Sequence, residues 1–366
     1  MNSKHARRAG LLLVATLATV AAGCGSDKKS SSSTAAPATT AAAAATTAAA
    51  SETTAAATEA TTADSASTGA TTGSGEAGAG IVLAVNPWTG SAVNANVAKV
   101  VLESKLNTSV TLQDIDENAT WPGMDAGDID AVLEVWPSGH AADVSTYIDE
   151  KKSVLDIGLL GPDAKIGWYI PTAMLEDHPE LATWEGFKDK DTAKLFATAE
   201  SGDDGQFLMG DPSYVSYDEQ IIENLDLPLK FVVAGSEAAL ITAIKNAVAD
   251  NSPLLMQFWQ PHWLQSQVDL TEVKLPDVTQ ECLDSAAAND GKYACDYPVD
   301  HLFKAASAKL EAKNPAAFSF LSKMQLTTDQ QNEIAANIDG GPAMTPAEAA
   351  QAWVDANPDV VDSWLS

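Results

Sequence analysis

Residues 25–80 consist almost entirely of Ala, Thr, Ser and Gly. The stretch has almost no branched apolar or aromatic side chains, so it cannot bury a hydrophobic core of its own. We therefore predict that residues 24–79 form a disordered linker, with a root-mean-square span of roughly 40 Å for a flexible coil of this length. The folded part must begin near residue 80, and it is long enough for two lobes of ordinary domain size.

The residues before this linker have the features of a signal peptide. Basic side chains near the start precede a short, mainly apolar run at residues 9–20, which is too short to span a bilayer comfortably. The run ends in Val20-Ala21-Ala22-Gly23-Cys24, which resembles a bacterial lipobox. We predict a lipoprotein signal peptide at residues 1–23 and a lipid on Cys24 that anchors the protein to the cell membrane on its outer side. The alternative is an ordinary signal peptide with an incidental Cys.

The formal net charge of -29 limits the partners of this chain. A nucleic acid or an anionic membrane surface would repel so acidic a protein, and a strongly anionic solute is disfavoured for the same reason. An exported hydrolase is the main alternative of another class. It is not supported, because the chain has no Gly-x-Ser-x-Gly and no His-Glu-x-x-His motif, and we expect neither catalysis nor a metal or cofactor.

Besides Cys24, the chain has only Cys282 and Cys295, which flank a loop containing Gly, Asn and Asp. Disulfides persist in the environment of an exported protein. We predict one disulfide between them, which in the chain-entropy model contributes about 3 kcal/mol. Two free thiols are the alternative.

From residue 81 onward, short apolar runs alternate with helix-like segments, which is typical of an α/β protein. The first half is expected to hold strands at residues 81–85, 110–115 and 131–135, and a helix at residues 93–106. The third strand stops at Trp136-Pro137-Ser138-Gly139-His140, because Pro and Gly force a loop.

The alternation repeats in the second half. Extended segments are expected at residues 166–170, 231–233 and 254–258, and helices at 193–197, 221–225 and 237–248. Three further helices are expected near 316–324, 329–338 and 347–356, the last with a capping box of Thr345 and Glu348. We predict a first lobe of residues 80–168 and 275–366, covered by these last helices, and a second lobe of residues 169–274. Two facing open sheets create a ligand cleft at the carboxyl ends of their strands.

Tryptophan is frequent in this chain, and several Trp residues lie where a core does not need them. Four of them lie within two residues of a Pro at a junction of strand and loop: Trp88, Trp136, Trp259 and Trp263. Such positions present a ring rather than bury it. A quaternary ammonium cannot donate a hydrogen bond, so a protein holds it with aromatic faces, each contributing up to about 2 kcal/mol when desolvated.

These residues resemble a known family, the glycine betaine/proline betaine-binding proteins of ABC uptake systems. The resemblance covers about residues 80–366 and is carried by five landmarks in order: Val85-Asn86-Pro87, Gly127-Asp128-Ile129-Asp130 leading into Trp136-Pro137, Asp211-Pro212-Ser213-Tyr214, Phe258-Trp259-Gln260-Pro261-His262-Trp263 and Lys313-Asn314-Pro315-Ala316-Ala317. It implies a two-lobed, type II periplasmic-binding-protein-like fold with the ligand cleft between the lobes. It also implies capture of glycine betaine or a similar quaternary-ammonium solute, delivery to an ABC transporter permease, and a monomer.

The resemblance also implies the site residues. The aromatic cage corresponds to Trp136, Tyr214 and Trp259. The solute's carboxylate would be held by His140 and by the backbone amides of Val215 and Ser216. In the related choline-binding and other betaine-binding branches an aromatic residue at the position of Trp88 lines the site, so Trp88 could replace or supplement Tyr214. Each of these side chains has an alternative, in which the aromatic rings only pack and His140 only caps a loop or a helix.

Position 90 bears on the choice of solute. In the family an acidic residue two places after the Trp88 position goes with choline, and this chain has Gly90 there. The resemblance therefore favours a carboxylated solute, with choline or carnitine as the alternative.

Overall fold

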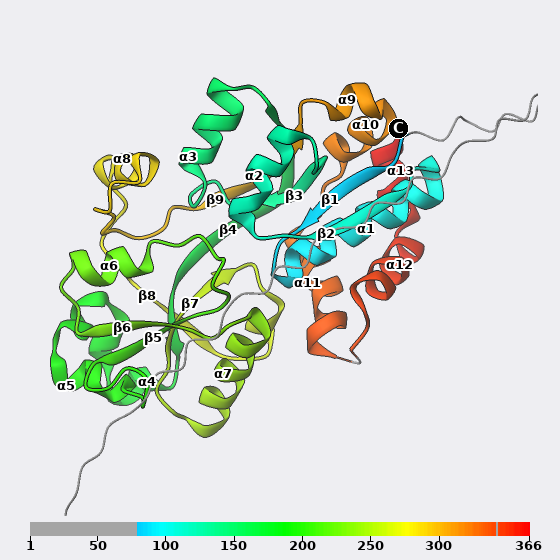
Figure 1. Ribbon diagram of the computed structural model, residues 1–366. Helices are drawn as coiled ribbons and strands as arrows, with labels where there is room; N and C mark the ends of the chain where they lie inside the picture. Colours follow the sequence, from blue (N-terminus) through cyan, green and yellow to red (C-terminus); the bar gives the residue numbers. More distant parts are fainter. Residues whose placement is uncertain (1–78, 342) are drawn as a thin grey trace, which may run out of the picture. The chain divides into compact units, whose positions relative to one another are not determined.

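The computed structural model describes residues 79–341 and 343–366, which are drawn as ribbons in Figure 1. The predicted signal peptide, the lipid anchor on Cys24 and all of the linker except residue 79 lie outside these residues. In this part of the chain, no helix is both long and apolar enough to cross a membrane.

The strands alternate with helices along the chain, as the sequence predicts. They are β1 (Ile81–Val85), β2 (Val110–Asp114), β3 (Ala131–Val135), β4 (Val154–Pro171), β5 (Gly205–Met209), β6 (Leu229–Val233), β7 (Leu255–Gln260), β8 (Leu270–Val273) and β9 (Asp300–Ser307). They pair in the order β2-β1-β3-β9-β4-β7-β5-β6, with β8 also on β4.

The long strand β4 belongs to two sheets. Its first part, as far as Ala164, pairs with β9 in the sheet that contains β1, β2 and β3. From Lys165 onward it pairs with β7 and β8, beside β5 and β6. One continuous strand thus joins two lobes, and the predicted two-lobed α/β fold is confirmed.

The helices are α1 (Thr89–Leu106), α2 (Glu117–Ala126), α3 (Ala141–Asp143), α4 (Met174–Asp177), α5 (Lys190–Ala193), α6 (Asp218–Asn224), α7 (Glu237–Asp250), α8 (Gln280–Ala288), α9 (Leu310–Lys313), α10 (Pro315–Lys323), α11 (Thr328–Ala335), α12 (Pro346–Ala356) and α13 (Pro358–Leu365). Short 3-10 segments occur at Pro179–Ala182, Trp184–Lys188, Lys194–Phe196 and Trp263–Ser266, and π-helical segments at Val144–Glu150 and Ala336–Gly340.

Local sequence signals explain several helix ends. The Thr345 hydroxyl and the Glu348 side chain form the predicted capping box at the start of α12, which satisfies backbone N–H groups that a helix start leaves unpaired. Asn107 and Asn251 end α1 and α7 in the left-handed conformation, which Asn tolerates better than most residues. The predicted return of the last helices is confirmed, because α10, α11 and α12 pack against α1 in the first lobe (Figure 1).

The parallel strands point their carboxyl ends toward the same region. β1 and β3 are parallel neighbours in the first sheet, and the loops after them carry Trp88 and Trp136. β5 and β7 are parallel neighbours in the second sheet; Tyr214 follows β5, and Trp259 lies near the end of β7. This arrangement places the candidate residues at strand ends, where open α/β sheets bind ligands.

Cys282 and Cys295 form the predicted disulfide, with their Cα atoms 6.3 Å apart. Cys282, Cys295 and Tyr297 share a buried cluster with Trp168 and Phe207, so this loop packs onto the core of the second sheet. The lobe boundaries at residues 168 and 275 stay a prediction; on this packing we propose that the second lobe extends to about residue 297.

Strand β9 differs from the sequence prediction, which places only helices after the Cys282 loop. Its apolar pattern is interrupted by Lys304, which is nevertheless fully buried. The Lys304 ammonium donates to the carbonyl oxygens of Leu321 at 2.7 Å and of Met324, at the end of α10. The positive charge is favourable at a helix carboxyl end, even though burial lowers the pKa of Lys304 to about 8.

Candidate ligand cavity between the lobes

A cavity of about 40 Å³ lies where the loops of the two lobes meet. Six of the seven ligand-binding residues predicted from the sequence line it: Trp88, Trp136, His140, Tyr214, Val215 and Trp259. The seventh, Ser216, does not line the cavity, and its hydroxyl lies 3.5 Å from the sulfur of Met209 instead. A single water needs about 10–15 Å³ on this measure, so the cavity suits only a small solute group.

Four aromatic rings form the walls. The Tyr214 ring stands edge-on to Trp88, with centroids 6.0 Å apart and planes at 76°, and edge-on to Trp259, at 5.7 Å and 88°. Trp136 completes the set from the first lobe. Rings at such steep angles form a box rather than a stack. We call Trp88, Trp136, Tyr214 and Trp259 the aromatic cage; in this structure Trp88 supplements Tyr214 and does not replace it.

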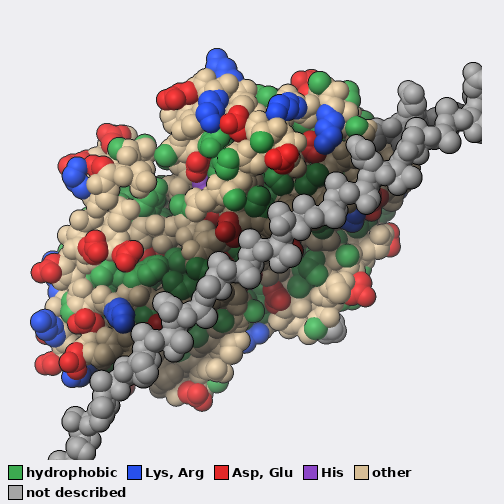
Figure 2. Space-filling view, in the orientation of Figure 1, with side chains coloured by type: hydrophobic (Ala, Val, Ile, Leu, Met, Phe, Trp, Pro, Cys, Tyr) green, Lys and Arg blue, Asp and Glu red, His purple; other side chains and the backbone are tan. Residues whose placement is uncertain are grey.

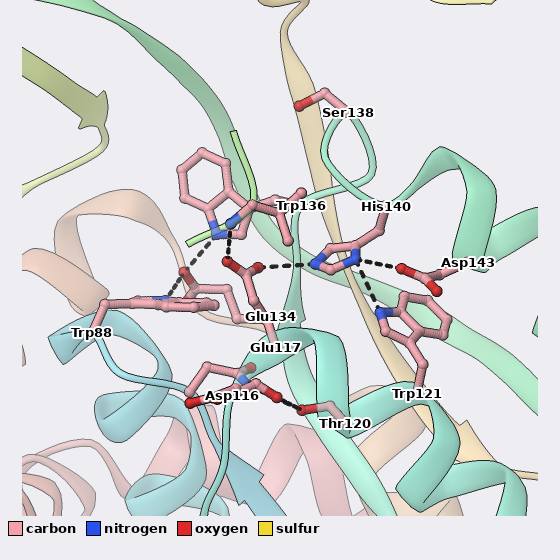
Figure 3. A network of polar contacts seen from close by, with 12 residues as sticks. Trp88, Asp116, Glu117, Thr120, Trp121, Glu134, Trp136, Ser138, His140 and Asp143 are labelled. Carbon is pink, nitrogen blue, oxygen red and sulfur yellow. Dashed lines mark hydrogen bonds and ion pairs between the residues drawn. The ribbon is translucent and has the colours of Figure 1, made fainter. Parts of the chain in front are cut away.

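His140 binds two carboxylates of the protein itself. Its Nε2 lies 2.9 Å from Glu117 Oε2, and its Nδ1 lies 2.9 Å from Asp143 Oδ2 (Figure 3). Burial lowers the pKa of His140, but the hydrogen bonds to Asp143 and Glu117 outweigh burial and raise the pKa to about 9. The Trp121 indole N–H also lies 3.1 Å from Nδ1, so both ring nitrogens of His140 are already engaged by groups of the protein.

Glu117 joins the two lobes at the cavity. It is the first residue of α2 in the first lobe, where the helix dipole favours a negative charge. One carboxylate oxygen binds His140, and the other accepts from the backbone N–H of Val215 in the second lobe at 2.6 Å. Glu117 thus occupies two of the groups, His140 and the Val215 amide, that the family resemblance assigns to the carboxylate of the solute.

Further hydrogen bonds connect the lobes around the cavity. The Tyr214 hydroxyl donates to the Pro87 carbonyl at 3.2 Å. The backbone N–H and hydroxyl of Thr89 donate to Glu237 at 2.7 and 2.8 Å, and Glu237 also binds His262 at 3.1 Å. These contacts hold the lobes closed over the cage. His262 supports the cage from outside, since it does not line the cavity.

Two important carboxylates are absent from the sequence prediction, Glu117 and Glu134. Glu134 accepts the indole N–H groups of both Trp88 and Trp136 (Figure 3). The sequence does point to Glu134, because it is the one charged residue of the otherwise apolar strand β3, and burying a charge is unfavourable unless the charge is paired or hydrogen-bonded. The sequence does not point to Glu117, since an acidic residue in the first turn of a helix is ordinary.

The structure shows which side chain lies next to Gly90. A Cβ atom at position 90 would lie 2.9 Å from an oxygen of Glu134, so a carboxylate fills the space next to this residue. The absence of an acidic side chain at position 90 therefore does not leave this region without a negative charge. The solute preference drawn from Gly90 stays a prediction.

Acidic side chains are spread over the face drawn in Figure 2, which agrees with the net charge of -29. Among the residues the structure describes, no group of three or more His, Cys, Asp or Glu side chains is arranged to hold a metal ion. The polar side chains that line the cavity beside the aromatic rings are Glu117, His140 and Gln257.

Comparisons with known proteins agree with this geometry. A family model described as the substrate binding domain of the ABC-type glycine betaine transport system matches residues 79–356. The trimethylamine N-oxide-binding protein of Pelagibacter ubique is 27% identical over 292 residues, which cover 76% of this chain and 88% of that protein. The matched family consists of substrate-binding proteins of ABC importers, which act outside the cytoplasm and are not enzymes.

Solved structures show the same fold. Lactococcal OpuAC, closed around glycine betaine, aligns with a TM-score of 0.61 and 20% identity over 78% of this chain and 99% of that one. An ABC-transporter choline-binding protein in complex with choline aligns with a TM-score of 0.62 and 18% identity over 78% of this chain and 91% of that one. At these identities the likeness shows the two-lobed architecture.

Proposed function

The chain belongs to the family of substrate-binding domains of ABC-type glycine betaine transport systems, and from this premise we propose that it captures a small methylated-ammonium solute in the aromatic cage. The observation that supports this most directly is the convergence of Trp88, Trp136, Tyr214 and Trp259 from both lobes on one cavity. Neither lobe alone completes the cage, so the bound solute favours the closed form, which a permease can distinguish from the open form.

The energetics fit a solute of this kind. Four desolvated faces contribute up to about 8 kcal/mol gross at about 2 kcal/mol each. A micromolar complex needs about 8 kcal/mol net. Because binding has its own entropic cost, the polar end of the solute must add to the affinity, and the groups around Glu117 decide which polar end is accepted.

Glycine betaine is the solute predicted from the sequence, yet the contacts of Glu117 favour a solute without a carboxylate. A betaine carboxylate would have to displace Glu117 from both His140 and the Val215 amide, or lie beside a like charge. Trimethylamine N-oxide, the ligand named for the Pelagibacter ubique relative, and choline both lack a carboxylate. We propose that solutes of this class bind more tightly than glycine betaine.

Calorimetric titration of the purified protein tests this function. Trimethylamine N-oxide, choline and glycine betaine are compared with glycine, which has no methyl groups. We expect saturable binding of at least one methylated solute, no binding of glycine and no turnover. If none of the methylated solutes binds, the cage assignment is wrong; if glycine betaine binds most tightly, the cage stands but our interpretation of Glu117 does not.

We also propose that the protein is a lipoprotein anchored through Cys24, which the lipobox-like residues before it support. It would then deliver its solute, as a monomer, to an ABC transporter permease in the same membrane. Palmitate labelling in cells tests the anchor. The wild-type protein is expected to take up label and to stay with the membrane fraction, and Cys24→Ser to do neither. An unlabelled wild-type protein in the soluble fraction would contradict the anchor.

A further inference from the structure

We infer that Glu134 is the positioning residue of the aromatic cage: a single buried carboxylate fixes the indoles of Trp88 and Trp136 and strengthens the attraction of their faces for a cation. This inference rests on the proposed function, because it concerns how the cage binds a methylated ammonium group. It adds a residue that does not line the cavity itself.

Both cage indoles of the first lobe converge on one oxygen. The Nε1 atoms of Trp88 and Trp136 donate to Glu134 Oε1 at 2.7 and 3.0 Å (Figure 3). Trp88 belongs to the loop between β1 and α1, whereas Trp136 follows β3. Because both bonds end on the same atom, the two rings are held in a fixed relation to each other as well as to the sheet.

The second oxygen of Glu134 anchors the carboxylate to two helices. Oε2 accepts from the side-chain amides of Asn94 in α1 at 2.6 Å and Gln331 in α11 at 2.8 Å. All four donors are N–H groups. A carboxylate is the side chain that only accepts hydrogen bonds, whereas a Gln at this position would turn an NH₂ group toward at least one of them. The four N–H donors therefore favour Glu over Gln at position 134.

The negative charge of Glu134 is not balanced by its partners. Its four donors are neutral, and the residue is only 4% exposed. Burial raises the pKa of Glu134 to about 7, although the bonds from Trp88, Trp136 and Gln331 lower it. A cation bound against the two indoles would favour the ionised form of Glu134, and the negative charge behind the rings would in turn stabilise the cation.

The hydrogen bonds also act through the rings. An indole whose N–H donates to a carboxylate is polarised, since hydrogen bonds in a chain strengthen one another in a medium of low dielectric. More electron density on the ring face increases the attraction of that face for a cation. Two of the four cage rings receive this effect from the same carboxylate. Because the effect is electrostatic, it depends on the charge of the solute and not on its shape.

A pair of isosteric probes isolates the effect of charge. Choline carries a quaternary ammonium, and 3,3-dimethyl-1-butanol has the same shape without the charge. In Glu134→Gln we expect the affinity for choline to fall at least about fivefold and that for the neutral alcohol to change less than twofold, by calorimetry or competition. An equal loss for both probes would show that Glu134 only positions the rings and would overturn its electrostatic role. No loss of choline affinity would overturn the whole inference. A wild-type protein that binds neither these probes nor any other methylated solute would instead overturn the proposed function on which the inference rests.

Asp218 provides a matched control. It is also a buried carboxylate, and it accepts from the Trp168 indole at 2.7 Å and the Tyr297 hydroxyl at 3.0 Å, but it does not line the cavity. Asp218→Asn is expected to lower the thermal unfolding temperature as Glu134→Gln does, while leaving the ratio of choline to alcohol affinity unchanged. A changed ratio in Asp218→Asn would show that buried acids in general act on the site and would contradict the specific role of Glu134.

A second pair of variants tests the inference even if Glu134→Gln does not fold. Phe keeps an aromatic face but has no N–H donor, so Trp88→Phe breaks one bond to Glu134. Trp259→Phe makes the same change at a cage ring that is not a donor to Glu134. We expect the ratio of choline to alcohol affinity to fall at least about threefold further in Trp88→Phe than in Trp259→Phe. Equal ratios would contradict a role for the carboxylate.

Discussion

Trp136→Ala and Trp259→Ala are each expected to weaken the binding of the preferred methylated-ammonium solute by at least about tenfold. Each change removes one face of the cage, and tenfold in affinity corresponds to about 1.4 kcal/mol, within the range of a desolvated cation–π contact of up to about 2 kcal/mol. The two residues lie on different lobes, after β3 and in β7. Calorimetry on both variants, with thermal unfolding as a check on folding, measures the effect.

Trp353 is the matched control for these changes. It is buried in α12 and stacks on Trp364, with centroids 6.1 Å apart, away from the cavity lining. Trp353→Ala is expected to destabilise the fold while the affinity for the solute stays within twofold. Unchanged affinity in both cage variants would show that Trp136 and Trp259 only pack between the lobes, the alternative that the sequence leaves open.

Glu117→Gln is expected to improve the binding of glycine betaine relative to choline by at least about tenfold. The wild-type carboxylate lies where the betaine carboxylate would bind, and two carboxylates about 4 Å apart repel by about 4 kcal/mol at an effective dielectric constant of about 20. An amide removes the charge and preserves the size. In this variant the hydrogen bond to Asp143 still raises the pKa of His140, whereas the contribution of the Glu117 carboxylate is removed.

Asp143→Asn separates a local effect from a general change of charge. Asp143 is the other carboxylate bound to His140, but it does not line the cavity. We expect the ratio of betaine to choline affinity to change less than threefold in this variant. If Glu117→Gln and Asp143→Asn have equal effects on the ratio, Glu117 does not select the solute by its position.

The positions of the cage residues could be predicted because their signals are local. A Pro close to a Trp at the end of an apolar run marks a ring held at a strand end, and the structure brings Trp88, Trp136 and Trp259 to one cavity. Trp263 has the same signal but is buried and does not line the cavity. The alternation of apolar runs likewise predicts β1 and β3 with their observed bounds. These features are determined by residues that are close together in the chain, so they can be predicted from one sequence.

The carboxylates that surround the cage could not be predicted in the same way. Glu117 meets Val215 across 98 positions of the chain, and Glu134 meets Gln331 across 197. Such contacts arise only when the lobes and the last helices are packed together. Strand β9 is a similar case. Lys304 makes its sequence pattern resemble that of a surface segment, and only the folded structure shows the carbonyl oxygens that accept hydrogen bonds from the ammonium group.

The most direct test of the account is a crystal structure of the protein with the solute that binds most tightly in calorimetry. We predict that its methyl groups contact the faces of Trp88, Trp136, Tyr214 and Trp259, and that Glu117 keeps its bonds to His140 and to the Val215 amide. A solute bound outside the cage would contradict the proposed function. A solute carboxylate bound to His140 and Val215, with Glu117 displaced, would restore glycine betaine as the natural ligand and contradict the selection we assign to Glu117.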